Sequence, residues 1–143
     1  MITIGLDNGV VIRSSKRQIT RDILPQELIY PFENDYIAGE VEIVYWRKNW
    51  NLRNAVLDSN AVSPIEGKAY EFSIDTPAQV FELIKIIVSF MNKETWEDYS
   101  HGSTIWEYED YLPILQQNVM NLAIIASFMM NNPDIYLVFY DSY

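Results

Sequence analysis

The chain has 143 residues, with 20 acidic side chains against 10 basic ones, and its formal net charge is -10. A hydrophobic content of 49% and a length typical of one domain argue against a disordered chain. Without cysteine, and with His101 as its one histidine, it lacks the residues for a disulfide scaffold, a thiol nucleophile or a Cys-ligated metal.

The first 40 residues are predicted to form short strands and turns. Hydrophobic residues alternate over residues 2–6, and the turn signal Asp7-Asn8-Gly9 follows. Residues 10–12 then have the composition of a return strand, so the pattern predicts an opening β-hairpin. The apolar stretch 24–32 contains two prolines and is expected to be a packed connecting segment.

A first helix is predicted over Glu40 to Leu57. Apolar residues from Val41 to Val56 recur at helical spacing and would share one face. The alternative is a strand over residues 41–45 that leads into a shorter helix.

The second helix has the clearest start, after a short predicted strand over residues 69–74. Thr76 is expected to be the N-cap, Pro77 the first helical residue, and Gln79 the partner of Thr76 in a capping box. The helix is expected to end within residues 92–95.

A polar loop over residues 96–105 is predicted to precede the third helix. That helix would hold Pro113 in its first turn and end at Asn131-Asn132-Pro133. The β-branched and aromatic run from Ile135 to Tyr140 is typical of a buried strand.

These elements predict a single α+β domain over residues 1–143, with about three helices packed on a short-stranded antiparallel sheet. Residues 1–40 would be its strand-and-turn segment, and residues 41–143 its helix-rich segment closing with a strand. No secretory signal is visible, and the longest apolar run, residues 122–130, is too short to span a membrane. We therefore expect a soluble, cytoplasmic protein; the oligomeric state stays open.

The acidic excess lies in the C-terminal half, where residues 71–143 hold eleven acidic and two basic side chains, a net of -9. This balance disfavours direct binding to nucleic acid, which depends on Lys and Arg, and favours a basic protein partner. The alternative is ordinary solubilising charge. The residues expected to form an acidic binding face are Glu94, Glu97, Asp98, Glu107, Glu109 and Asp110.

A weaker binding candidate is the aromatic and basic stretch Tyr45, Trp46, Arg47 and Lys48. Rings beside cations can make cation–π contacts or stack on bases. In the structural alternative, the rings pack inward and Arg47 or Lys48 pairs with acids of the C-terminal half.

Signals for catalysis or cofactor binding are weak. Gly102-Ser103-Thr104 with the acids that follow matches neither a phosphate-binding loop nor an EF-hand. Glu107 and Asp110 could form an acid–base pair, or bind Mg²⁺ or Ca²⁺ together with Asp98, but such carboxylate spacings are common on helices. We therefore expect no catalytic residues, no metal and no cofactor.

Several short motifs together carry a family resemblance. In chain order they are Tyr45-Trp46-Arg47-Lys48, Asn51, Asn54, Gly102-Ser103-Thr104, Tyr108, Asp110, Tyr111 and the run from Ile135 to Tyr143. Over roughly residues 40–143 the chain resembles a family of small uncharacterised phage and prophage proteins, with a Tyr-Trp-Arg-Lys-x-Asn-like helix, a Gly-Ser-Thr segment followed by acids and tyrosines, and a closing aromatic strand. It departs from that family at Trp50, Leu52-Arg53 and Tyr143. The resemblance implies a mobile-element origin and no particular activity.

The sequence thus favours a non-enzymatic phage-type accessory protein that binds a basic protein and does not bind nucleic acid or membrane. An acidic face would inhibit a nucleic-acid-binding host or defence protein by imitating phosphate charge. Two alternatives remain: an immunity protein against a basic nuclease toxin, and a small carboxylate- or metal-dependent enzyme.

Overall fold

The computed structural model describes residues 7–35, 39–100 and 107–142 and has an α+β fold. The strands in this part of the chain are β1 (Asp7–Ser14), β2 (Val41–Arg47), β3 (Ser63–Pro64), β4 (Glu71–Ile74) and β5 (Ile135–Ser142). The helices are α1 (Trp50–Leu57), α2 (Pro77–Phe90), α3 (Lys93–Ser100) and α4 (Tyr108–Asn131), with a short 3-10 helix, η1, at Arg21–Ile23.

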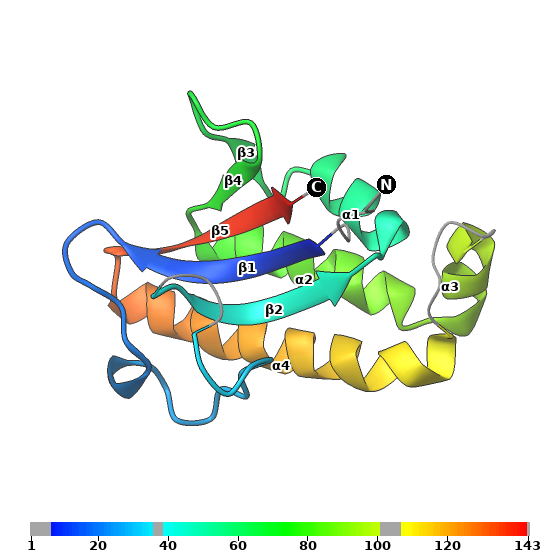
Figure 1. Ribbon diagram of the computed structural model, residues 1–143, viewed down its shortest axis with the longest axis horizontal. Coiled ribbons are helices and arrows are strands. Elements are labelled where there is room, and N and C mark those ends of the chain that lie inside the picture. Colours follow the sequence, from blue (N-terminus) through cyan, green and yellow to red (C-terminus); the bar gives the residue numbers. More distant parts are fainter. Residues whose placement is uncertain (1–6, 36–38, 101–106, 143) are drawn as a thin grey trace.

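The strands form one antiparallel sheet in the order β2-β1-β5-β4-β3, so β1 lies between β2 and the C-terminal β5. Helices α2 and α4 pack side by side behind the sheet (Figure 1). This arrangement confirms the predicted fold class. The described residues hold four α-helices where about three were predicted, because α3 occupies part of the predicted loop.

Helix α3 is stabilised by a capped first turn and by the burial of Trp96 near its middle. The side chain of Asn92 accepts hydrogen bonds from the backbone N–H groups of Glu94 and Thr95 at 2.9 and 3.2 Å, which caps the first turn. Trp96 is buried against the start of α4. The prediction of a loop over residues 96–105 was therefore wrong for residues 96–100, while residues 101–106 lie outside the described part of the chain.

The Asp7-Asn8-Gly9 segment belongs to strand β1 and is not the predicted hairpin turn. Asn8 donates a hydrogen bond across the sheet to Oδ1 of Asp141 at 2.8 Å, and Gly9 pairs with residues on both neighbouring strands. Cross-strand contacts therefore outweigh the local turn preference. Residues 2–6, the other half of the predicted hairpin, lie outside the described residues.

Residues 41–47 form strand β2, so the helix predicted from Glu40 was wrong in its first half and the alternative strand is correct. The pairing of β1 with β2 shifts between Val10 and Val11, and this irregularity leaves Ile43 and Val44 both buried. Strict alternation is lost, which is why the pattern resembled helical spacing. Lys48 then takes a left-handed conformation, and Asn49 caps α1 through a 3.2 Å bond from the Leu52 N–H.

The other predicted elements are present, with some of their ends shifted: α2 ends at Phe90, before the predicted residues 92–95, and α3 already begins at Lys93. Thr76 caps α2 by accepting the Gln79 N–H at 3.2 Å, and Gln79 accepts the backbone N–H of Asp75 at 3.0 Å. Strand β4 lies within the predicted residues 69–74, and β5 covers the run beginning at Ile135. Helix α4 begins at Tyr108, so Pro113 falls in its second turn and not its first.

The two faces of the sheet differ. Val10 and Ile12 of β1 and Leu137 and Phe139 of β5 belong to the hydrophobic core beneath α2 and α4. Because side chains alternate along a strand, the intervening residues point to the opposite side. We call that side the open sheet face; it carries Gly9, Val11 and Arg13 of β1, Glu42 and Tyr45 of β2, Glu71 of β4 and Tyr140 of β5.

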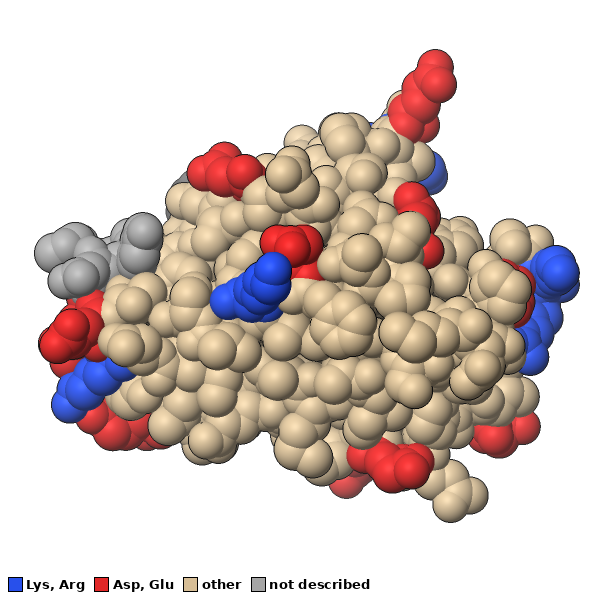
Figure 2. All heavy atoms as spheres, turned by 180° about the vertical axis from the view of Figure 1, so that it is seen from behind, with Lys and Arg blue, Asp and Glu red and all other residues tan. Residues whose placement is uncertain are grey.

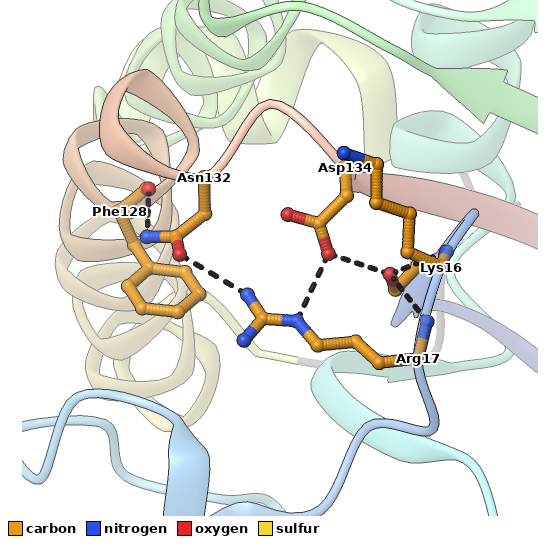
Figure 3. A network of polar contacts seen from close by, with 6 residues as sticks. Lys16, Arg17, Phe128, Asn132 and Asp134 are labelled. Atoms are coloured by element: carbon orange, nitrogen blue, oxygen red, sulfur yellow. Dashed lines mark hydrogen bonds and ion pairs between the residues drawn. The ribbon is translucent and has the colours of Figure 1, made fainter.

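A polar network joins the end of β1 to the start of β5 (Figure 3). Asp134 accepts hydrogen bonds from the Ser14 hydroxyl at 2.6 Å and from Nε of Arg17 at 2.9 Å. Arg17 also donates to the side chain of Asn132 at 3.1 Å. The Ser14 hydroxyl, followed by Arg17, holds the pKa of the Asp134 carboxyl below its ordinary value. The network ties the α4–β5 connection to the end of β1.

Helix α4 is the one helix among the described residues that is long and apolar enough to cross a membrane. It packs against the sheet and α2 and buries Leu115, Leu122 and Ile125 completely. This packing is consistent with the core helix of a soluble protein.

Candidate functional site

The predicted acidic face lies at one end of the molecule, where α3 meets the start of α4. Its described side chains, which we call the acidic end, are Glu94, Glu97, Glu107, Glu109 and Asp110, and all five are exposed. The side chain of Asp98 lies outside the described part of the chain. Lys93 stands among the acids, with Nζ 3.2 Å from Oε1 of Glu109 and 4.0 Å from Oε1 of Glu97.

Aromatic packing holds the acidic end together. The Trp96 ring lies 6.2 Å from the Tyr108 ring and 5.3 Å from the Tyr111 ring, measured between centroids. The Tyr108 hydroxyl donates a 2.6 Å hydrogen bond to the Met91 carbonyl before α3. The acids of residues 94–97 and of residues 107–110 are therefore placed on one corner of the molecule.

The electrostatics of the acidic end are those of solvated charges. A hydrogen bond from its own backbone N–H, followed by the ion pair with Lys93, lowers the pKa of Glu109, and Glu109 in turn raises the pKa of Lys93. Among the described residues, no three His, Asp or Glu side chains are grouped so as to hold a metal ion. The geometry suits a contact surface and shows no metal centre in the described part of the chain.

The aromatic and basic stretch does not form one surface. In strand β2, Trp46 points into the core and is fully buried, whereas Tyr45 lies on the open sheet face. Arg47 is exposed at the strand end, and Lys48 begins the turn into α1. The predicted burial of Trp46 is confirmed, and Trp50 is half-buried, but the shared helical face was wrong. Further along this region, Arg53 pairs with the C-terminal acid Asp141.

The outer side of α2 and α4 is an apolar surface that the sequence analysis did not single out. Phe81 and Val88 of α2 and Met120 and Met130 of α4 are all more than two-fifths exposed. Between Tyr111 and Asn131 the sequence contains no charged residue. Figure 2 shows this side of the molecule, where most charged side chains lie around the periphery and a basic and an acidic side chain lie nearer the middle. On α2 the exposed ion pair of Lys85 with Glu82 lies between Phe81 and Val88 in the sequence. We call Phe81, Val88, Met120 and Met130 the apolar helix face.

A pocket on the open sheet face was also missed. Its volume is about 320 Å³. Its walls include Asp7 and Arg13 of β1, Glu40 just before β2, Tyr45 of β2, Glu71 of β4 and Tyr140 of β5. These residues are far apart in sequence and meet because β1 lies between β2 and β5. Strand pairing across a chain of this length leaves no local sequence signal for such a site.

Glu42 lies beside this pocket, in contact with the wall residue Tyr140. The Tyr140 hydroxyl donates a hydrogen bond to Oε2 of Glu42 above Gly9, where a Cβ would lie 2.0 Å from that oxygen. Glu42 is only 3% exposed. Among the described residues, its Oε1 and Oδ1 of Asp7 are buried without a hydrogen-bond partner.

Burial raises the pKa of Glu42 to about 7; the Tyr140 hydrogen bond acts against this shift, and the nearby Asp7 charge adds to it. Burial and the Glu42 charge together raise the pKa of Tyr140, so the phenol keeps its proton at neutral pH. The pair is therefore a carboxyl that titrates near neutrality and a hydroxyl that does not.

At the other end of the pocket, Arg13 is bound by two carboxylates. Its Nε donates to Oε1 of Glu40 at 2.9 Å, and its Nη1 and Nη2 donate to Glu71 at 3.0 and 3.3 Å. The paired carboxylates, led by Glu71, raise the pKa of Arg13, and Arg13 lowers that of Glu71. This fork geometry is the strong, bidentate form of the Arg–carboxylate pair.

Comparison with known proteins adds no family to these observations: no family model, curated protein or solved structure matches the chain. The resemblance to phage and prophage proteins stays a prediction from short motifs.

Proposed function

We propose that the chain is a non-enzymatic binding protein whose partner is a basic protein. The observation that carries this proposal is the surface along α4, which begins with the exposed acids Glu107, Glu109 and Asp110 and continues without charge to Asn131. Met120 and Met130 are exposed along it. Protein interfaces commonly combine an apolar centre with a charged rim.

Both parts of this surface contribute to the argument. Several large apolar side chains exposed on one side of a soluble protein are a feature of interaction sites, and Phe81, Val88, Met120 and Met130 give the outer side of α2 and α4 this character. The acidic end lies next to them and, with the net charge of -10, would attract a cationic surface and speed its association. The partner that fits is basic opposite α3 and apolar opposite α2 and α4.

A protein that binds nucleic acid presents such a basic surface, because it must neutralise phosphates. We therefore extend the proposal to inhibition of a nucleic-acid-binding host or defence protein by charge mimicry, in the cytoplasm, by a protein of mobile-element origin. The origin rests only on the sequence resemblance, while the binding mode rests on the surface.

The test is affinity capture from a lysate of the organism that carries the gene, with three forms of the tagged protein. The first is wild type, and the second carries Glu107→Lys, Glu109→Lys and Asp110→Lys. The matched control carries Glu27→Lys, Asp58→Lys and Glu66→Lys, which change the net charge equally at exposed sites away from the acidic end.

We expect the wild type and the control to capture the same basic protein and the acidic-end variant to lose it. Phe81→Gln and Met120→Gln should also weaken its capture. Raising the salt should slow association steeply, because the Debye length falls from about 8 Å at 0.15 M to about 3 Å at 1 M. Equal capture by the acidic-end variant and the control would overturn the proposed contact surface.

A further inference from the structure

We propose that the pocket on the open sheet face is a binding site for a guanidinium group. The inference goes beyond the proposed function, because the pocket lies on the sheet and shares no residue with the acidic end or the apolar helix face. The chemistry is a planar organic cation, either a small free molecule or an arginine side chain presented by a polypeptide.

The pocket has the size of a small-ligand site. Its volume of about 320 Å³ lies at the lower end of the range usual for ligand pockets, about 300 to 1,000 Å³. Val11 forms part of its wall, and the rings of Tyr45 and Tyr140 stand on the strands either side of β1. A guanidinium plane can stack against such rings.

The pocket carries a net negative charge. Asp7, Glu40 and Glu71 line it, and the one cation in its described wall is Arg13. Two of these carboxylates, Glu40 and Glu71, are already used by Arg13. Asp7 is the wall carboxylate not used by Arg13, and Glu42 lies close enough to it for their charges to interact.

Two unmet acceptors lie at or behind this Asp7 end. Oδ1 of the wall residue Asp7 is one; the other is Oε1 of Glu42, which does not line the pocket but contacts the wall residue Tyr140. Both oxygens are buried and, among the described residues, receive no hydrogen bond. A buried acceptor without a donor costs free energy, so native structures rarely keep one without a water, an ion or a ligand. A donor-rich cation would satisfy both oxygens and neutralise the charge.

A guanidinium group has the geometry to donate to both carboxylates at the Asp7 end. It offers five N–H groups in one plane and no acceptor, so it can serve two carboxylates from one position while its faces meet the tyrosine rings. Arg13 provides an internal precedent, since its own guanidinium bridges Glu40 and Glu71 in the same pocket. The Asp7 end also brings two carboxylates, Asp7 and Glu42, close enough for their charges to interact.

The test is a titration of the full chain followed by two-dimensional amide NMR with four probes. Ethylguanidinium represents a small free cation, and a blocked Gly-Arg-Gly peptide represents an arginine carried by a protein. A blocked Gly-citrulline-Gly peptide has nearly the same shape without charge, and ethylammonium has the charge without the plane. The variants are Asp7→Asn and Glu42→Gln, with Glu109→Gln as a matched control at the acidic end.

We expect saturable shifts at Gly9, Val11 and Tyr140 with at least one guanidinium probe, and at least tenfold weaker binding of citrulline and ethylammonium. Each pocket variant should weaken binding about tenfold, the loss expected for one charge-assisted hydrogen bond, and the control should not. Shifts with ethylguanidinium alone identify a small-cation site, and shifts with the peptide identify one that accepts a protein-borne arginine.

Either result supports the inference, provided that the shifts lie at the pocket. It is overturned if neither guanidinium probe shifts these residues at millimolar concentration, or if citrulline binds as well as arginine. Unchanged affinity in both Asp7→Asn and Glu42→Gln, with the amide spectrum of the folded protein preserved, would overturn it as well. Failure here leaves capture by the acidic end untouched, so the two proposals fail separately.

Discussion

Two buried carboxylates in this sheet have opposite surroundings. Asp141 on β5 lies on the helix side, is 3% exposed, and accepts bonds from Arg53 at 2.7 and 2.9 Å and from Asn8 at 2.8 Å. Glu42 on β2 lies on the open sheet face and is equally buried, but among the described residues its hydrogen-bond donor is the Tyr140 hydroxyl alone. One carboxylate is fully paired, and the other keeps a free oxygen beside a pocket.

The difference shows that burial alone does not identify a functional carboxylate. A buried charge paired with a cation is a structural element, and removing its partner is costly. A buried carboxyl without a cation keeps its proton to a higher pH and gains from any cation that reaches it. We therefore expect removal of the charge partner at Asp141 to lower the stability of the fold, and removal of the charge at Glu42 to raise it.

The largest expected effect is at the paired site. Arg53→Met keeps the apolar stem but leaves Asp141 buried without its cation, and we expect it to destabilise the fold by about 3 kcal/mol. Chemical denaturation measures the loss. The double variant Arg53→Met with Asp141→Asn should recover part of it, because no uncompensated charge remains. A loss that the second substitution does not reduce would contradict the assigned pairing.

The next largest effect tests the packing around Glu42. A Cβ at Gly9 would lie 2.0 Å from Oε2 of Glu42 and 2.6 Å from the Val44 carbonyl oxygen. Gly9→Ala should therefore destabilise the fold by about 2 kcal/mol, as overpacked sites do. The same substitution in a Glu42→Ala background should cost less, since the closest of three contacts is gone; the third is the Tyr140 hydroxyl oxygen at 2.7 Å. Equal costs in both backgrounds would show that Glu42 does not lie over Gly9.

Glu42→Gln should raise the free energy of unfolding, and the size of this gain should depend on pH. The folded-state pKa of Glu42 is raised from 4.5 to about 7, so the native state binds an extra proton between these values. That stability is present at low pH and is lost as the pH rises through about 7, where the buried charge forms. We expect Gln to stabilise by about 2 kcal/mol near pH 8 and by little near pH 5. A pH-independent difference would contradict the raised pKa.

The smallest expected effect is at the acidic end. Glu94 and Glu97 are exposed, and Lys93 is exposed among the acids. Exposed ion pairs contribute little to stability. Replacing Lys93 by Ala should leave the denaturation midpoint nearly unchanged. Reversing the charges of Glu107, Glu109 and Asp110 puts cations at the N-terminus of α4, where the helix dipole favours acids, so we expect a small loss of stability there together with altered association with a basic partner. A large loss of stability would show that this surface is structural.

The elements that were predicted correctly carry local signals. The Thr76 cap with Pro77 marks α2, and the β-branched and aromatic run from Ile135 marks β5. Strands β1 and β2 were harder to predict. Strand β1 holds turn-forming residues, and the irregular pairing of β2 with β1 breaks the alternation of buried and exposed side chains. Long-range pairing decides both, and it is not visible in a short window.

The candidate sites divide in the same way. The acidic end is predictable because most of its acids are close together in sequence on two adjacent helices. The pocket is not, since Glu42 and Tyr140 are 98 residues apart and meet only through β1. Its one local trace is Gly9, whose missing side chain makes room for the Glu42 carboxylate, and the sequence analysis assigned that glycine to a turn.

The most direct test is a heteronuclear NMR titration of the Glu42 side-chain carboxyl, with and without ethylguanidinium. The free protein should show a midpoint near pH 7, set by burial beside Asp7, and saturation with the cation should move the midpoint lower, because a cation favours the charged carboxylate. A midpoint near the ordinary value of 4.5, unchanged by the cation, would contradict the conclusion that Glu42 is a buried carboxyl that binds a cation at the pocket.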